Sequence, residues 1–253
     1  MRMLQKTLLI TALFFLLLPS GLSAAGDPVA EADGLLKNPA LDLSGALRAL
    51  DLYAQNLARA NPPEVPLLTR LVRTCFLIGE LTVASQRQKY YETGQCYAEM
   101  LLKEQPARVE GHYWLGMHLC GLADTGGAML GRRLLPRIME ELKKAQTIDA
   151  AYDQAGSHRV LGRIYYEAPA WPLSVGDLQK SLQHLTTAVR LAPENSTNHL
   201  YRAETLIKLR RQAQARQELE QVLQAPRHAL LARGLEEDRR EARRLLQESV
   251  ASE

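Results

Sequence analysis

Six histidines are the side chains best suited to acid–base or metal chemistry, and their spacing predicts neither. The chain has no H-E-x-x-H sequence, and no two histidines are four residues apart, the spacing that places two ligands on one helical face. His112 and His118 are six residues apart and would face different directions on one helix. We interpret each histidine as a surface or packing residue, with metal binding as the less favoured alternative. The six are His112, His118, His158, His184, His199 and His228.

Other catalytic patterns are equally missing from the sequence. An enzyme needs a nucleophile with a base, paired carboxylates in a cleft, or metal ligands at usable spacing. The chain holds no G-x-S-x-G and no glycine-rich phosphate loop after a strand. We therefore predict no enzyme activity, no cofactor and no metal site.

The three cysteines, Cys75, Cys96 and Cys120, leave two interpretations open. In an oxidising compartment two of them could pair and leave the third free. Cys96 and Cys120 fall on successive predicted helices, so a bridge between them is geometrically possible. We favour the alternative, in which all three are small apolar packing side chains, because no spacing forces a bridge.

A patch of cationic and apolar residues is the candidate binding surface. Arg159, Arg163 and Tyr166 are spaced to share one side of a helix, and Tyr113 and Met117 would face the same way on the preceding unit. Such a patch suits an anionic amphiphile or an acidic peptide. The alternative is an arginine pair that solvates an exposed helix face beside packing aromatics. We hypothesise that Arg159 and Arg163 contact the ligand. The candidate binding residues are Tyr113, Trp114, Met117, Arg159, Arg163, Tyr166 and Trp171.

Helices must position these residues, because apolar side chains recur at i, i+3 and i+4 along the chain. No window alternates apolar and polar residues for long enough to require a strand. Residues 61–63 (NPP) and Pro106 end helices, since proline lacks the donor for a further turn. The sequence therefore predicts an all-α chain of helices joined by short breaks.

The helices repeat as phased pairs. Residues 112–116 (HYWLG) resemble the W-x2-L-G-x2-Y start of a tetratricopeptide (TPR) helix pair, and residues 161–165 (LGRIY) supply the L-G-x2-Y part in full. Pro106 and Pro193 each precede the next small packing position, Gly116 or Ala203, by ten residues. Small residues let antiparallel helices approach closely, and leucine and tyrosine fill the space between pairs. The predicted packing residues are Gly94, Ala98, Leu115, Gly116, Ala145, Leu161, Gly162, Tyr165, Ala188, Ala203 and Ala215.

Two predicted units exceed the usual 34-residue TPR length. The first insertion is expected at residues 121–133, with Gly126-Gly127 as a flexible point, and the second at residues 168–177, a turn punctuated by prolines that contains Trp171. Long loops on a rigid solenoid often carry function. Trp171 either contributes to binding or fills a gap between neighbouring loops.

The N-terminus predicts export. Arg2 and Lys6 precede an apolar run over residues 8–18, and small residues end at Ala25, where we expect signal-peptide cleavage. The run is shorter than the about 20 residues that span a bilayer, so we expect no stable membrane insertion after cleavage. Loss of Arg2 and Lys6 lowers the formal net charge from +3 to +1, which gives no electrostatic case for nucleic-acid binding.

Further residues suggest a more specific family. Residues 90–99 (YYETGQCYAE), residues 113–116 (YWLG) and residues 161–169 (LGRIYYEAP) together resemble the T component of tripartite ATP-independent periplasmic (TRAP) transporters. The resemblance extends over about residues 44–226 on the repeat criterion. It implies a helical periplasmic repeat protein that assists the transporter's substrate-binding protein and contains an apolar ligand cleft. The eukaryotic regulators of microtubule dynamics, which have a similar helical design, are a more distant match, since a cleaved signal peptide would not suit them.

We predict a TPR-like helical-hairpin solenoid of about four helix pairs with a C-terminal capping helix. The expected divisions are residues 1–25 (signal peptide), 26–43 (N-terminal extension), 44–226 (repeat domain) and 227–253 (capping helix). The predicted function is a periplasmic scaffold that binds a protein partner through its concave groove, with a TRAP substrate-binding protein as one candidate. The alternative is a carrier that holds a small apolar or lipid-like ligand between repeats.

Overall fold

The computed structural model describes residues 27–38, 40–60, 62–226 and 232–250, and these residues form eleven α-helices and no strand. The predicted signal peptide lies outside the described residues. No helix in the described ranges is long and apolar enough to span a bilayer. The helices are α1 (Pro28–Lys37), α2 (Leu43–Arg59), α3 (Val65–Leu81), α4 (Ala84–Glu104), α5 (Val109–Thr125), α6 (Gly127–Ile148), α7 (Tyr152–Glu167), α8 (Leu178–Leu191), α9 (Ser196–Lys208), α10 (Gln212–Gln224) and α11 (Ala232–Val250).

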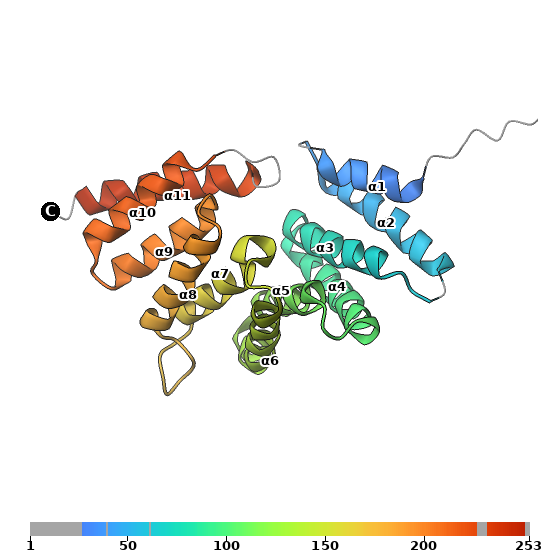
Figure 1. Cartoon of the computed structure of the whole chain (residues 1–253), viewed down its shortest axis with the longest axis horizontal. Coiled ribbons are helices and arrows are strands. Elements are labelled where there is room, and N and C mark those ends of the chain that lie inside the picture. The colour runs from blue at the N-terminus through green and yellow to red at the C-terminus, as the bar shows by residue number, and fades with distance from the viewer. Residues whose placement is uncertain (1–26, 39, 61, 227–231, 251–253) are drawn as a thin grey trace, which may run out of the picture.

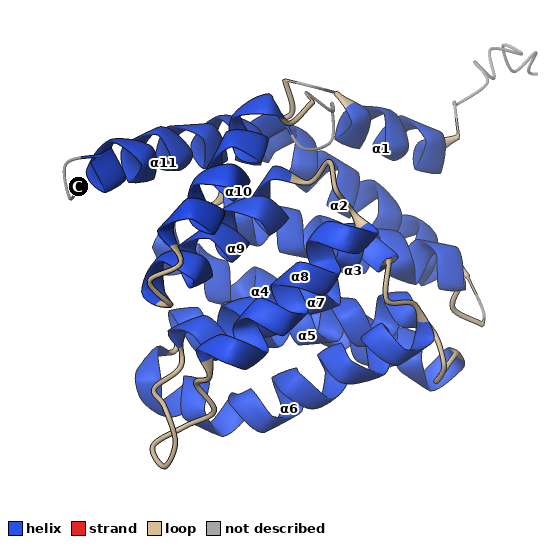
Figure 2. Ribbon diagram, turned by 60° about the vertical axis from the view of Figure 1, so that its left-hand side comes forward, coloured by secondary structure: helices blue, strands red, loops and turns tan. Residues whose placement is uncertain are grey.

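The helices pack as consecutive antiparallel pairs that follow an arc (Figure 1). Helices α3, α5, α7 and α9 form its inner row, in which each helix contacts the next, and their partners α4, α6 and α8 lie on the outer side. Turned by 60°, the molecule has α1 and α11 at one side and α6 at the opposite side (Figure 2). The all-α TPR-like prediction is confirmed, with the four expected pairs at α3–α4, α5–α6, α7–α8 and α9–α10.

A fifth hairpin, α1–α2, precedes these pairs and includes most of the expected N-terminal extension. Asp27 caps α1 by accepting the Val29 amide, and Pro28 occupies the first helical turn, where its missing amide hydrogen costs nothing. The carboxylate of Asp33 then accepts hydrogen bonds from Tyr53 on α2 and Arg70 on α3. One acidic side chain thus holds α1 against the first repeat.

Close packing at glycines sets the distance between helices within each pair. All eleven predicted packing residues are buried. A Cβ added at Gly162 would lie 2.6 Å from Cγ of Leu185 on α8, and one at Gly116 would lie 2.9 Å from Cδ2 of Leu142 on α6. The backbones of α5 and α7 therefore approach their partners at the places where the sequence supplies no side chain.

Two histidines make the same contacts in two different repeats. The Nδ1 atoms of His112 and His199 lie 2.6 and 2.7 Å from carboxylates of Glu141 and Glu218, which belong to the second helix of each pair. Their Nε2 atoms lie 2.8 and 2.9 Å from carbonyl oxygens of Pro106 and Pro193, six residues upstream in both cases. Each histidine therefore ties the proline turn to both helices of its own pair. The sequence contains the same P-x5-H spacing in both repeats, although we did not predict these contacts from it.

The first insertion is helix rather than loop. Helix α5 runs to Thr125 and α6 starts at Gly127, so residues 121–133 lengthen both helices, and our expectation of a long loop there was wrong. Leu130 and Leu134 continue the helical spacing through this segment. The turn between the two helices depends on glycine for its backbone, because Gly127 has φ +76°, in the left-handed region that other residues avoid.

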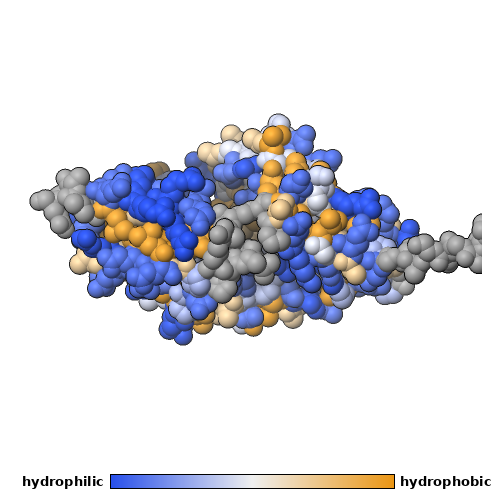
Figure 3. All heavy atoms as spheres, turned by 90° about the horizontal axis from the view of Figure 1, so that it is seen from above, coloured by the Kyte–Doolittle hydropathy of each residue, from blue (hydrophilic) through white to orange (hydrophobic). Residues whose placement is uncertain are grey.

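Helix α11 packs against both α9 and α10 at the C-terminal end. Leu235 and Ala242 are buried there, and Asp238 accepts hydrogen bonds from Ser196 and Thr197 at the start of α9. Seen from above, an apolar strip at this end of the molecule is flanked by strongly polar surface (Figure 3). Leu235 and Ala242 therefore cover the last repeat, as expected for a cap, while part of the apolar strip lies at the surface.

Replacing Gly162 with Ala should destabilise the fold by about 2 kcal/mol, because the new methyl group overlaps Leu185 and this overpacking outweighs the gain in helix propensity. The matched control is Gly34→Ala in α1, where nothing lies within 4 Å of the added Cβ. That variant should gain roughly 0.5–1 kcal/mol. Urea unfolding measures both, and equal effects of the two substitutions would contradict the packing argument.

Candidate functional site

The inner row presents a cluster of cations and aromatic rings on α7 and α9. The guanidinium of Arg163 lies 4.8 Å from the ring centroid of Tyr166 and 4.5 Å from that of Tyr201. It also pairs with carboxylates of Glu204 and Glu167. Burial works against the charged guanidinium, but these carboxylates outweigh it and raise the pKa of Arg163. We call Arg163, Tyr166, Tyr201, Glu204 and Lys208 the inner-row cluster.

Lys208 extends the cluster toward solvent. Its Nζ atom lies 3.6 Å from the ring centroid of Tyr166 and donates to the Tyr166 carbonyl oxygen, while the residue itself is exposed. Tyr166 is half-buried, so two cations contact its ring while part of the ring still reaches water. Burial raises the pKa of Tyr166 and of Tyr201, which keeps both rings neutral and their hydroxyl groups able to donate.

Arg159 lies one helical turn earlier and is occupied by internal contacts. Residues 153–155 at the start of α7 all have positive φ, between 50° and 61°. Arg159 donates to the carbonyl oxygens of Asp153 and Gln154 and forms an ion pair with the Asp153 carboxylate at 3.1 Å. Asn198 on α9 donates to the Gln154 carbonyl oxygen from the other side. The guanidinium predicted to contact ligand is therefore used to hold a left-handed turn.

Two further candidate residues lie in the interior. Tyr113 is 1% exposed and donates to Asp153 at 2.5 Å, and Trp114 is 8% exposed and donates to the Tyr152 hydroxyl at 3.0 Å. Burial raises the pKa of Tyr113 well above its ordinary value, so its hydroxyl remains a donor. Met117 is half-buried and packs against the same core. Of the predicted inner-face residues, the structure thus brings Arg163 and Tyr166 together at the surface and places Tyr113, Trp114 and Arg159 beneath it.

Trp171 belongs to a separate site on the outer side. It lies in the loop between α7 and α8, where its side chain is 84% exposed, so it does not fill a gap between loops. The loop has defined geometry, since Gly176 donates to Pro169 and Asp177 to Tyr165, each at 2.9 Å. No side chain fits at Gly176, because a Cβ there would lie 2.0 Å from the Ala168 carbonyl oxygen.

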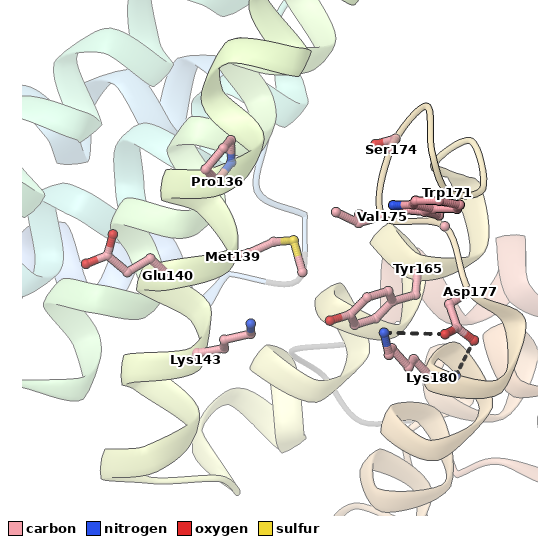
Figure 4. Close-up of a pocket in the computed structure, with 11 residues that line it drawn as sticks. Pro136, Met139, Glu140, Lys143, Tyr165, Trp171, Ser174, Val175, Asp177 and Lys180 are labelled. Carbon is pink, nitrogen blue, oxygen red and sulfur yellow. Dashed lines mark hydrogen bonds and ion pairs between the residues drawn. The ribbon is translucent and has the colours of Figure 1, made fainter.

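The loop forms one wall of a cleft of about 600 Å³ whose opposite wall is α6 (Figure 4). Met139 and Lys143 point into it from α6, and Tyr165 and Lys180 from the side of α7 and α8. We call this the outer cleft. From the sequence we predicted Trp171 as a binding residue and Tyr165 as a packing residue. Nothing in the sequence indicates that α6 lies opposite them.

The cysteines are free thiols in the structure. Burial raises the pKa of Cys75 and of Cys120 to about 12, which suppresses the reactive thiolate and fits their interpretation as packing residues. Cys96 is exposed and does not fit that interpretation.

The histidines on different helices make contacts that spacing along the chain did not reveal. His158 on α7 and His184 on α8 lie 3.1 Å apart between Nδ1 atoms, and the His184 ring stacks on Tyr165. Burial lowers the pKa of His184 to about 4, and it does the same for His118, whose Nε2 donates to the Val72 carbonyl oxygen. In the described part of the chain, no three histidine, cysteine or acidic side chains are arranged to hold a metal ion.

A family model named regulator of microtubule dynamics protein 1-3 matches residues 29–172, which extend from α1 to the Trp171 loop. The chain belongs to this family. The match reverses our ranking, which placed these regulators behind the TRAP T component, and no family or relative supports the TRAP assignment. Helices α8 to α11 follow the matched region.

The fold has a solved relative in a thermophilic TPR protein of Thermus thermophilus. The two are 19% identical, with a TM-score of 0.61 over 83% of this chain and 96% of the other. At that identity the likeness establishes the TPR-like fold alone. A comparison with curated proteins gave no match.

The two arginines should respond differently to truncation. Arg159→Ala removes the donor to the Asp153 and Gln154 carbonyl oxygens and frees the left-handed turn, so we expect a loss of about 3 kcal/mol in unfolding free energy. Arg163→Ala removes contacts to side chains only, two carboxylates and two rings, and leaves the backbone of α7 unchanged, so it should cost about 1 kcal/mol. Guanidinium unfolding of both variants tests this, and a larger loss for Arg163→Ala would contradict the assignment of Arg159 as the structural arginine.

Acid should weaken the fold through His118. Its pKa is about 4 in the folded chain against 6.5 for an unperturbed histidine, so the unfolded chain binds the additional proton. This contribution to stability is complete above pH 6.5 and is lost as the pH falls to about 4, by roughly 3 kcal/mol. Proton NMR should find the His118 ring neutral at pH 5.5, and His118→Gln should flatten the dependence of unfolding free energy on pH. A ring that titrates near pH 6.5 would exclude this account.

Proposed function

We propose that this protein is an interaction scaffold that binds a protein partner through the inner-row cluster. The observation that carries the proposal is a partly exposed guanidinium with two partly exposed tyrosine rings on adjacent inner helices, held in place by contacts within the protein. Arginine and tyrosine are the residue types that most often dominate binding energy at protein interfaces. Because Arg163 and Tyr166 are already ordered, binding there costs little side-chain entropy.

The charges of the cluster favour an acidic segment of the partner. Lys208 is exposed and Arg163 is half-buried, while Glu204 is more deeply buried than either. Burial is the main cause that raises the pKa of Glu204. Its largely buried carboxylate therefore contributes less to the surface charge than Lys208 does. An acidic side chain can therefore approach the cluster at Lys208, the exposed cation, whereas Arg163 is already paired with the exposed Glu167.

The family supports a role in protein interaction. Its name describes the regulation of microtubule dynamics by its named members, an activity that acts on a protein polymer. The TPR-like fold is likewise typical of scaffolds that bind through a concave inner surface. Neither observation identifies the partner of this chain.

We also propose that the protein acts in the periplasm, after cleavage near Ala25. This proposal rests on the charged and apolar pattern of residues 1–25, and N-terminal sequencing of protein from the periplasmic fraction tests it.

We further propose a link to a TRAP transporter, which rests on the motifs at residues 90–99, 113–116 and 161–169. Neighbouring genes for transporter membrane subunits would support that link, and their absence would count against it.

Site-specific crosslinking tests the proposed function. With benzoylphenylalanine in place of Tyr166, we expect a crosslink to one discrete polypeptide in the cell of origin, and Arg163→Ala in the same chain should reduce the yield at least tenfold by loss of the anchor. The matched control places the crosslinker at Met100 on α4, a partly exposed position in the outer layer. Equal yields at both positions would exclude the inner row as the interface.

Native mass spectrometry of the purified protein distinguishes the scaffold from the carrier alternative, because a carrier requires a small molecule bound in stoichiometric amount.

A further inference from the structure

We propose that the outer cleft is a second binding site, which takes an extended peptide segment that carries an apolar side chain flanked by acidic side chains. The site shares no residue with the inner-row cluster, because it is built from α6, Tyr165 near the end of α7, the loop at residues 168–177 and the start of α8. It adds a peptide-recognition surface on the outer layer of a scaffold whose proposed partner binds on the inner row.

The walls of the cleft supply an apolar slot. Met139 and Tyr165 face one another and form its floor, and Val175 closes the side beside Trp171 (Figure 4). Met139 is 8% exposed and Tyr165 is 9% exposed, and the ring of Tyr165 is stacked on His184, so this floor is rigid. An aromatic or branched aliphatic side chain entering the slot would meet a thioether, a ring and a valine.

Exposed apolar surface at the mouth favours a peptide over a small molecule. Trp171 is 84% exposed and Leu173 is 80% exposed, although both belong to a loop with defined internal hydrogen bonds. A small molecule in the slot would leave both side chains in water. A chain that passes over the mouth would cover them, and a desolvated tryptophan is a frequent centre of binding energy.

Charge defines the flanking residues of the peptide. The cleft contains Lys143 and Lys180 on opposite walls, and Lys143 has no ion-pair partner in the described structure. The acidic groups nearby are engaged, since Glu140 pairs with Lys144 at 2.7 Å, and Asp177 accepts the amide hydrogens that start α8 and pairs with Lys180 at 3.5 Å. The positive charge of Lys143 also contributes to the lowered pKa of His184 behind the floor, after burial and His158. A carboxylate beside the apolar anchor would meet the unpaired ammonium of Lys143, and a second one would share the exposed ammonium of Lys180 with Asp177.

Tryptophan fluorescence tests the proposal directly, because the chain has two tryptophans and Trp114 is only 8% exposed. The probe is acetyl-Ala-Glu-Phe-Leu-Glu-Ala-amide. It should shift the Trp171 emission to shorter wavelength, protect it from iodide quenching and saturate with a dissociation constant below about 1 mM at low salt. The same peptide with both Glu replaced by Lys, and one with Phe-Leu replaced by Ser-Ser, should each bind at least tenfold more weakly.

Variants assign the binding to the cleft. With a labelled peptide and anisotropy detection, Trp171→Ala and Lys143→Glu should each weaken binding at least tenfold, and Lys103→Glu, at an exposed lysine on α4, should leave it unchanged. An unchanged Trp171 emission, equal affinity for the lysine peptide, or an unaffected Lys143→Glu variant would each overturn the proposal. A response to decanoate without a response to the peptide would also overturn it, in favour of a small amphiphile. Arg163→Ala should not alter peptide binding, which separates this test from that of the inner row.

Discussion

The contact between Arg159 and the turn at residues 153–155 determines how the two halves of the arc join. Three consecutive residues other than glycine adopt positive φ there, a conformation that costs about 1–2 kcal/mol for each. The cost is offset because Arg159 binds two carbonyl oxygens and the Asp153 carboxylate, while Tyr113 donates to the same carboxylate from α5. The turn sets the direction in which α7 leaves α6, so the positions of α8 to α11 depend on it.

The same contact explains which arginine remains for binding. Arg159 and Arg163 are one helical turn apart and share a side of α7, but the left-handed turn lies beside the first and α9 beside the second. Arg159 is used to bind the carbonyl oxygens of Asp153 and Gln154 in that turn. Arg163 meets only side chains, the rings of Tyr166 and Tyr201 and two carboxylates, and stays partly exposed. Identical spacing thus yields one structural and one surface residue.

The repeat could be predicted from the sequence because it depends on local rules. Small residues at Gly116 and Gly162 and the prolines that end helices act at fixed spacing, whatever lies elsewhere in the fold. The turn at residues 153–155 could not be predicted, since Asp, Gln and Ala do not mark a left-handed run and the partners that hold it come from α5 and α9. The outer cleft was hidden for a similar reason, because α6 and the Trp171 loop are brought together only by packing of successive pairs.

Helix α7 carries both candidate surfaces through consecutive residues. Tyr165 turns toward α8 and forms the floor of the outer cleft, whereas Tyr166 turns toward α9 and joins the inner-row cluster. Coupling between the two sites would require α7 to move against α8, and the close approach of Gly162 to Leu185 leaves no space for such a shift. A rigid α7 therefore favours independent binding at two faces. In that arrangement the scaffold gains affinity for a partner, or a pair of linked partners, through simultaneous engagement rather than through a change of shape.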